Sequence, residues 1–363
     1  MTQNNVAKRG FIFGIILLFV GTTFAPCTAN NIGENQSQPA QDGNTLYVGG
    51  SGPGNYSRIQ DAVENASDGD TVFVYDDSSP YYERIYINKS IMLQGENKKT
   101  TIIDSKEAGT TVTLSSDRIR ISGFTLQSSR VIDAAGIQAG FIQDISIDDT
   151  IVKNHDYGLL FIYVENLSIH DNELSENEVG IRLNSCTLGS VYTNIIDGNG
   201  QGIISWSQQI NFSSNLFNGN GEGLILYPGD FENNVIKNVF KDNRVGIELW
   251  YYGSQIEMNL FENNKIGLNI KDGKSYRIEK NNFVNNKVQA TFSYSIGNSR
   301  ENEFDGNFWS NHMNSQPKRI IGIFYKIFSW QIRSVFYSFT FAFPWFIFDN
   351  NPAQEPCDIS GVA

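Results

Sequence analysis

One pattern of apolar and polar positions recurs from Ile169 to Asn307: asparagine, any residue, a large apolar residue, two more residues, and asparagine again. The first asparagines of its seven copies lie 22, 21, 23, 21, 22 and 21 residues apart. These copies begin at Asn172, Asn194, Asn215, Asn238, Asn259, Asn281 and Asn302, and a weaker one spans Asp149 to Asn154. A fixed period of this length predicts stacked coils, because one such repeat cannot bury its own apolar side chains.

Short apolar–polar alternations between the motifs predict strands, since no apolar run has the length of a helix. In five copies a glycine stands three residues after the second asparagine. The first and third residues after this glycine are apolar, with Ser205 as the one exception. These glycines are Gly180, Gly202, Gly223, Gly246 and Gly267. Coils stacked at about 4.8 Å would align like residues into interior apolar columns. The pattern predicts a parallel β-helix, and the leucine spacing of a leucine-rich repeat is absent.

The asparagines are expected in the turns between strands. Asparagine tolerates a left-handed backbone there, and its side-chain amide can bond to the corresponding asparagine of the next coil. We therefore predict two asparagine columns along the stack.

The repeats resemble those of the pectate-lyase-like superfamily, and the order of the whole chain is most similar to NosD-type secreted β-helix proteins. The segments that carry this resemblance are residues 57–63, 69–72, 82–96, 101–104, 121–125, 307–309 and 349–356. The resemblance implies an all-β fold, a right-handed parallel β-helix of about 22-residue coils. It leaves the activity open, because this fold hosts many functions.

The order of segments predicts four regions. Residues 1–29 are interpreted as a signal peptide, with Lys8 and Arg9 before an apolar core at Phe11–Val20 that is short for a membrane span. Residues 30–44 form a polar linker, residues 45–312 the β-helix with its N-terminal cap, and residues 313–363 a C-terminal cap and tail. We expect a secreted or cell-surface protein. Six glycosylation sequons fit export: Asn35, Asn55, Asn65, Asn88, Asn166 and Asn211.

Both ends of the solenoid are predicted to be covered, since an open end would expose apolar side chains and strand edges. At the N-terminal end we expect a helix within Tyr56–Ser67, with Ser57 as its N-cap. At the C-terminal end an aromatic segment, residues 318–348, is expected to cover the last coil and fold back along the solenoid. Peripheral membrane contact by this segment is the alternative.

Charge and composition limit the partners. A net charge of −12 and a pI near 4.8 argue against nucleic acid, whose phosphates require basic patches. No metal and no cofactor are expected. His155, His170 and His312 are scattered, so the copper role that the NosD resemblance implies has no obvious ligand cluster. After signal removal Cys186 and Cys357 remain, and the sequence does not predict that they pair.

Most catalytic motifs of polysaccharide-acting β-helix enzymes are missing. Asp148 and Asp149 are expected to form a turn rather than a catalytic pair. Arg182 and Glu248 share a face but should lie three coils apart. The sequence therefore favours a non-catalytic protein. A lyase, hydrolase or epimerase is the alternative, and a copper-delivery accessory protein comes third.

One group of outward-facing aromatic residues predicts a binding surface. Trp206, Tyr227 and Trp250 occupy the outward position four residues after three successive glycines, so they should form an exposed aromatic ladder. Aromatic rings in a row suit a polysaccharide or cell-surface glycan, with Arg182 and Glu248 as polar neighbours. The alternative is that a loop or the aromatic C-terminal segment covers this face.

Overall fold

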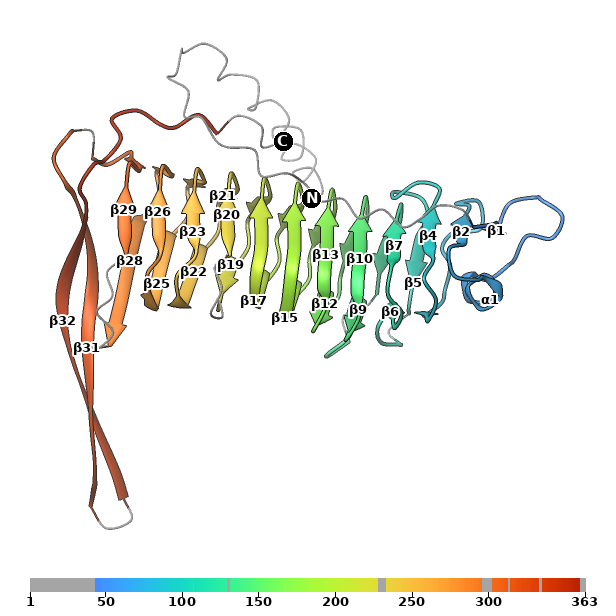
Figure 1. The fold of residues 1–363 in the computed structure, drawn as a ribbon, viewed down its shortest axis with the longest axis horizontal. Coiled ribbons are helices and arrows are strands. Elements are labelled where there is room, and N and C mark those ends of the chain that lie inside the picture. The colour runs from blue at the N-terminus through green and yellow to red at the C-terminus, as the bar shows by residue number, and fades with distance from the viewer. Residues whose placement is uncertain are drawn as a thin grey trace, which may run out of the picture. The chain divides into compact units, whose positions relative to one another are not determined.

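The computed structural model describes residues 43–106, 108–128, 131–227, 233–295, 302–312, 314–332 and 335–359. This part of the chain is a parallel β-helix with one short helix at its N-terminal end (Figure 1). The predicted fold class is therefore confirmed. The predicted signal peptide and all but the last two residues of the predicted linker lie outside the described residues.

Three walls of parallel strands enclose the core, and each turn of the chain visits the third wall, then the second, then the first. The first wall contains β1 (Thr45–Val48), β2 (Thr71–Val74), β4 (Met92–Gly95), β7 (Ile119–Ser122), β10 (Gln143–Asp148), β13 (Glu165–His170), β20 (Asn234–Ile236), β23 (Gln255–Glu257), β26 (Arg277–Glu279) and β29 (Glu303–Asp305). The second contains β3 (Ile85–Ile87), β6 (Val112–Leu114), β9 (Ala135–Gly140), β12 (Tyr157–Ile162), β19 (Glu222–Leu226), β22 (Val245–Tyr252), β25 (Ile266–Lys274) and β28 (Val288–Ser295). The long strands β15 (Val179–Tyr192) and β17 (Gln201–Ser213) pass through the corner between these two walls and pair within both.

The third wall is a separate ten-stranded sheet. Its strands are β5 (Ile102–Asp104), β8 (Thr125–Gln127), β11 (Ile151–Lys153), β14 (Glu173–Ser175), β16 (Ile195–Asp197), β18 (Leu216–Asn218), β21 (Val239–Lys241), β24 (Leu260–Glu262), β27 (Asn282–Val284) and β30 (Phe308–Trp309). The large apolar residue of each asparagine motif lies on this wall and faces the core. Phe217, Phe240, Phe261, Phe283 and Trp309 stack there face to face, with centroids 4.3–5.1 Å apart.

The predicted asparagine columns stand at the two corners of the third wall. In the first column the backbone and side-chain amides of Asn215 both donate to Oδ1 of Asn238, each over 2.9 Å. The same arrangement recurs along the buried column, which confirms the predicted amide bonding. The predicted left-handed backbone does not fall on the asparagines of the columns, although Asn154 of the weaker copy has a φ of 61°. The residue before each asparagine takes the positive φ, for example Ser214 at 54° and Lys237 at 57°.

The structure corrects the register of the motif at both ends of the repeat. Asn302 does not continue the first column, because the Oδ1 that accepts from Asn281 belongs to Asn307, and Trp309 rather than Phe304 aligns with Phe283. The chain makes a longer coil here, and Phe304 pairs in the first wall instead. At the other end, Thr150 and His155 begin the two columns, one residue after the predicted Asp149 and Asn154.

The glycine column lies where successive coils approach most closely. A β-carbon on Gly223 would lie 2.6 Å from the carbonyl oxygen of Gly246, and one on Gly246 would lie 2.5 Å from that of Gly267. Both distances are too short for a side chain. The repeated glycine therefore keeps the coils at their stacking distance.

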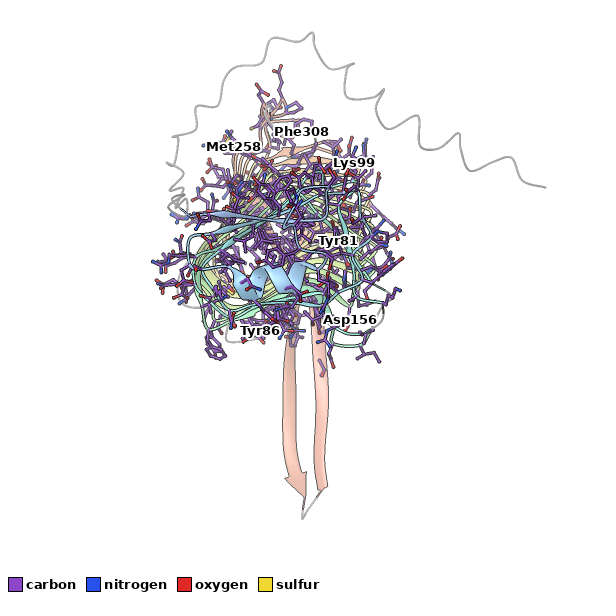
Figure 2. The ribbon with its side chains drawn as sticks, turned by 90° about the vertical axis from the view of Figure 1, so that its right-hand side faces the viewer. Tyr81, Tyr86, Lys99, Asp156, Met258 and Phe308 are labelled. Carbon is purple, nitrogen blue, oxygen red and sulfur yellow. The ribbon has the colours of Figure 1, made fainter. Side chains whose placement is uncertain are left out.

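The helical cap at the N-terminal end is α1 (Ile59–Asn65), which buries Ile59, Ala62 and Val63 against the first coil (Figure 2). The predicted N-cap was wrong, since Arg58 holds that position and makes no side-chain cap bond. The Glu83 carboxylate accepts instead from the backbone amides of Ile59 and Gln60. At the other end Lys89 Nζ donates to the last carbonyls of the helix. The negative charge of Glu83 at the N-terminal end and the positive charge of Lys89 at the C-terminal end both interact favourably with the helix dipole.

The C-terminal cap is an antiparallel hairpin of β31 (Lys318–Ile332) and β32 (Val335–Asp349). Its base continues the second wall, because Gly322–Tyr325 pair with the end of β28, and Ile320 reaches the core. After β32 the chain returns along the third wall, where Cys357 exchanges two backbone hydrogen bonds with the side chain of Asn282. The aromatic segment covers the last coil as predicted, but the expectation that it folds back along the solenoid was wrong, because the hairpin continues past the edge of the solenoid (Figure 1).

Candidate functional site

The predicted aromatic ladder lies on the outer side of the second wall. Strand register aligns Asn184 with Trp206 and Trp250 with Lys271, while Leu183, Ser205, Leu226 and Leu249 face inward. Trp206 and Tyr227 stack with centroids 4.6 Å apart and planes 2° apart. Tyr227 and Trp250 stack at 5.6 Å and 24°. The three rings therefore form one continuous stack over three coils.

The orientation of this stack decides what it offers to a ligand. Because the rings pack face to face along the solenoid, their edges point outward. Trp206 is 39% exposed, and Tyr227 and Trp250 are half-buried. A cation covers each end of the stack: the Arg182 guanidinium lies 5.0 Å from the Trp206 ring, and Lys271 Nζ lies 5.0 Å from the Trp250 ring. Such cation–π contacts stabilise the stack.

The polar neighbours of the ladder hold it in place. Arg182 donates to the hydroxyl of Tyr157 over 3.1 Å, a partner that the sequence did not indicate. Glu248 is only 7% exposed and accepts from Trp250 Nε1, Lys271 Nζ and Asn269 Nδ2, at 2.9, 2.8 and 3.1 Å. Glu248 is thus a buried support for the ring beside it.

Arg182 and Glu248 lie three coils apart, as the spacing predicted. The register between them passes through Ile204 and Ile225. These isoleucines face outward, yet they are only 6% and 4% exposed because they form a small apolar cluster with Val179, against which Tyr227 and Trp250 pack. An apolar floor therefore separates the two charged residues, and they do not form an acid–base pair.

Tyr227 is unsuited to act as a base near neutral pH. Burial raises the pKa of its hydroxyl, and the charge of Glu248 raises it further. The hydroxyl is consequently a hydrogen-bond donor or acceptor in its protonated form.

Three further exposed aromatic residues lie on the same corner of the solenoid, and sequence reasoning missed two of them, Phe141 and Tyr163. Phe141 and Tyr163 follow β9 and β12, are 79% and 55% exposed, and stack at 5.0 Å and 21°. Tyr251 follows Trp250, is 52% exposed, and is tilted by 43° against Tyr227. All three have positive φ, at 54–62°. Phe141 and Tyr163 follow the ends of their strands and Tyr251 lies at a register shift within β22, so strand alternation gives no signal for them.

Together these six residues define the aromatic edge: Phe141, Tyr163, Trp206, Tyr227, Trp250 and Tyr251. Strand register connects Gly140, Ile162, Asn184 and Trp206 on successive coils, so the edge spans five coil steps from Phe141 to Trp250. At about 4.8 Å per step this is roughly 24 Å. The predicted ladder from Trp206 to Trp250 covers only two of these five steps.

The acidic pair at Asp148 and Asp149 is divided between two ion pairs. Arg120 donates to both oxygens of Asp148, each over 2.8 Å, and Lys98 lies 3.0 Å from Asp149. Burial alone would raise the pKa of Asp148, but the hydrogen bonds and charge of Arg120 outweigh it and hold this pKa below its usual value. Asp149 is in the turn, as expected, whereas Asp148 ends β10 and is fixed by Arg120.

Comparison with known proteins identifies the family. The family described as "Periplasmic copper-binding protein (NosD)" matches residues 63–249 and 229–314. The chain belongs to the NosD family. Among curated proteins no match was found.

Solved structures resemble the NosD-family chain in fold. An A-module of the mannuronan C-5 epimerase AlgE6 from Azotobacter vinelandii is 16% identical with a TM-score of 0.59, over 69% of this chain and 81% of that one. The AlgE4 A-module from the same organism is 16% identical with a TM-score of 0.54, over 65% and 75% of the two chains. At this identity the likeness concerns the β-helix fold alone.

Potential metal ligands in this NosD-family chain are dispersed. The described ranges hold no group of three or more His, Cys, Asp or Glu that could share an ion. His155 is buried beside Thr111, and burial lowers its pKa to about 4. Cys186 is a free thiol and is also buried, which raises the pKa of its thiol. The described residues likewise include no helix of a length and apolarity sufficient to cross a membrane.

Proposed function

We propose that this NosD-family protein is an exported, non-catalytic protein that binds an extended polysaccharide or cell-surface glycan along the aromatic edge. The observation that carries the proposal is the length of this edge, with aromatic residues on five of the six coils it spans. Exposed aromatic surface is costly in water unless it meets a partner, and large exposed apolar patches mark binding surfaces. The family is described as periplasmic, which agrees with export.

The contact mode follows from ring orientation. The inner rings of the edge offer their rims, with Arg182 and the Tyr227 hydroxyl beside them for hydrogen bonds to sugar hydroxyls or carboxylates. Ring faces are accessible nearer its ends, where Phe141 is largely exposed and Tyr251 is tilted out of the stack. A polymer lying along the solenoid would meet one such feature on most coils.

A non-catalytic role is supported by the state of the charged groups. Glu248, Arg182 and Asp148 already have ion-pair or hydrogen-bond partners. Carbohydrate-acting chemistry requires an acid and a base placed together at the scissile or epimerised carbon. Neither the aromatic edge nor the Asp148 ion pair provides this arrangement.

The copper named in the family description does not fit the described residues of this chain. Copper sites are built from grouped His, Cys or Met side chains. His155 and Cys186 are buried in separate coils, and His170 bonds to Asp171 on another wall. Copper is therefore not part of the proposed function.

The test is retention of the purified exported protein on gels containing neutral or acidic polysaccharides. Mannuronan, which is named for the two epimerase A-modules, is included among the acidic polymers. Replacing both Phe141 and Tyr251 by Ala removes the two accessible ring faces, each contributing about 1 kcal/mol, so binding should weaken about tenfold or more. Retention unchanged by this double substitution would contradict the proposal.

The matched control is Tyr86→Ala, which removes an exposed aromatic ring of the same wall outside the aromatic edge. It should bind as the wild type does. Each incubation is also assayed for new reducing ends, unsaturated products and epimerised residues. Product formation would replace the non-catalytic proposal with the alternative of a polysaccharide-acting enzyme.

A further inference from the structure

The hairpin of β31 and β32 is longer than a cap requires. Among the described residues its pairing with the solenoid through β28 extends to Tyr325, and the Tyr325 hydroxyl donates to Asp272 at this junction. Beyond it, Lys326–Ile332 and the strand returning from Val335 to Phe341 continue past the solenoid (Figures 1 and 2). Seven residues per strand correspond to roughly 23 Å.

This projecting part has one strongly aromatic face. In an antiparallel ladder, opposed residues share a face and successive pairs alternate between faces. One face combines the pairs Lys326–Phe341, Phe328–Phe339, Trp330–Tyr337 and Ile332–Val335. The other combines Ile327–Thr340, Ser329–Ser338 and Gln331–Phe336. The first face thus has seven apolar or aromatic positions among eight, and the second has four polar positions among six.

The charge of this region is opposite to that of the chain. No Asp or Glu occurs from residue 306 to residue 348, whereas Lys318, Arg319, Lys326 and Arg333 fall within it. The whole chain carries −12. Cations interleaved with aromatic residues are typical of surfaces that meet anionic lipid headgroups.

The base of the hairpin carries a second apolar surface. Ile321, Ile323, Phe346 and Phe348 are exposed on its outer side, and the Arg319 guanidinium lies 4.8 Å from the Phe346 ring. A cap needs an apolar side toward the core, but an exposed outer side needs a further partner. By the same alternation this outer side continues as the more polar face of the projecting strands, whereas the aromatic face continues the side that carries the buried Ile320. The hairpin therefore has apolar surface on both sides: on its outer side at the base, and on the opposite side beyond the solenoid.

We propose that the hairpin binds an anionic lipid surface, with the Phe328–Phe339 and Trp330–Tyr337 positions entering the headgroup–acyl boundary. A two-stranded hairpin leaves edge N–H and C=O groups unpaired, so it lies at the interface rather than in the hydrocarbon. A second copy of the chain is the less favoured occupant, because two like-charged hairpins repel each other. The proposal is independent of glycan binding.

The test is co-sedimentation of the purified exported protein with vesicles of phosphatidylcholine, with and without phosphatidylglycerol. We expect binding to the anionic vesicles, reduced at high salt. The double substitution Phe339→Ser with Trp330→Ser should lower the bound fraction at least tenfold. Arg319→Gln with Lys326→Gln should reduce binding to anionic vesicles and remove most of its salt dependence.

The matched control is Phe336→Ser, the same change on the other face of the hairpin. It should retain binding, and all variants should keep the wild-type melting temperature. Equal binding by the Phe339–Trp330 variant and the control would overturn the proposal. So would a wild-type protein that forms dimers dependent on Phe339 and Trp330 but does not sediment with vesicles, because the occupant would then be a second copy.

Discussion

Single side chains at the corners of the coil account for much of the regularity of this solenoid. Each buried asparagine of the first column accepts two hydrogen bonds from one neighbouring coil and donates to the other, so few polar atoms at the corner lack partners. The sequence predicted this bonding because asparagine recurs at one interval. It did not predict which residue takes the left-handed conformation, because Ser214, Lys237 and their counterparts share no residue type.

His155 is the residue at which this regularity fails, and it makes the fold acid-sensitive. It starts the second column, where later coils have asparagine, and burial lowers its pKa from 6.5 to about 4. The unfolded chain binds the proton more tightly. His155 therefore contributes full stability above about pH 6.5, and this contribution, about 3 kcal/mol, is lost as the pH falls toward 4.

The substitution His155→Asn should remove this loss, since asparagine has no titrating group and is the residue that continues the column. Urea unfolding midpoints measured at pH 7 and pH 4.5 should differ less for the variant than for the wild type. His312→Gln, a surface change of similar kind, should leave the wild-type difference intact. An identical pH response in His155→Asn and the wild type would show that other groups set the acid sensitivity.

At the scale of elements, close stacking of the second wall depends on its glycine column. A β-carbon on Gly246 would meet the carbonyl oxygen of Gly267 at 2.5 Å and the Phe261 ring at 3.0 Å. Backbone of the adjacent coil cannot yield as a flexible side chain would. The glycine is therefore required by the approach of two coils, and its own φ is not left-handed.

Gly246→Ala should accordingly lower the free energy of unfolding by about 1–3 kcal/mol, as overpacking does elsewhere. The control is Gly140→Ala in the same wall, where the nearest atom to a new β-carbon is 3.4 Å away. Its stability should change by less than about 1 kcal/mol. Denaturant midpoints for the two variants measure the difference, and equal midpoints would mean that the stack can widen locally at no cost.

Elements with the repeat period could be predicted from sequence, and elements outside it could not. The walls, the glycine column and the ladder at Trp206, Tyr227 and Trp250 all follow from periodicity. Phe141 follows the end of β9 and Tyr251 lies at a register shift within β22, so alternation carries no signal for them. The ends of the repeat were misaligned because one longer coil places Asn307, not Asn302, above Asn281. The face of the hairpin that each aromatic residue occupies depends on a register that composition does not specify.

At the scale of the molecule, a solenoid is stabilised mainly by contacts between neighbouring coils, so its ends determine how it opens. The two caps use different means. At the N-terminal end α1 is held by Glu83 and Lys89, which bond to its opposite ends. At the C-terminal end the first asparagine column ends on the carboxylate of Asp349, at the end of β32, which joins the hairpin to the last coil.

Asp349 is therefore expected to control opening from the C-terminal end. It is fully buried, and its Oδ2 accepts from the backbone and side-chain amides of Asn307 and from Trp309 Nε1, at 3.0–3.1 Å. Asp349→Ala would leave these donors unpaired, at a cost of about 1–3 kcal/mol each. Asp349→Asn retains an acceptor oxygen and should be much milder.

Hydrogen exchange resolved along the chain tests this expectation. Because coupling is between neighbours, Asp349→Ala should accelerate exchange most in β27 and β30, less in β24, and least in β11 and β14. The Asn variant should show the same gradient at smaller amplitude. Uniform acceleration in all of these strands would mean that the described coils open as one cooperative unit, and Asp349 would then contribute to global stability without acting as a terminal latch.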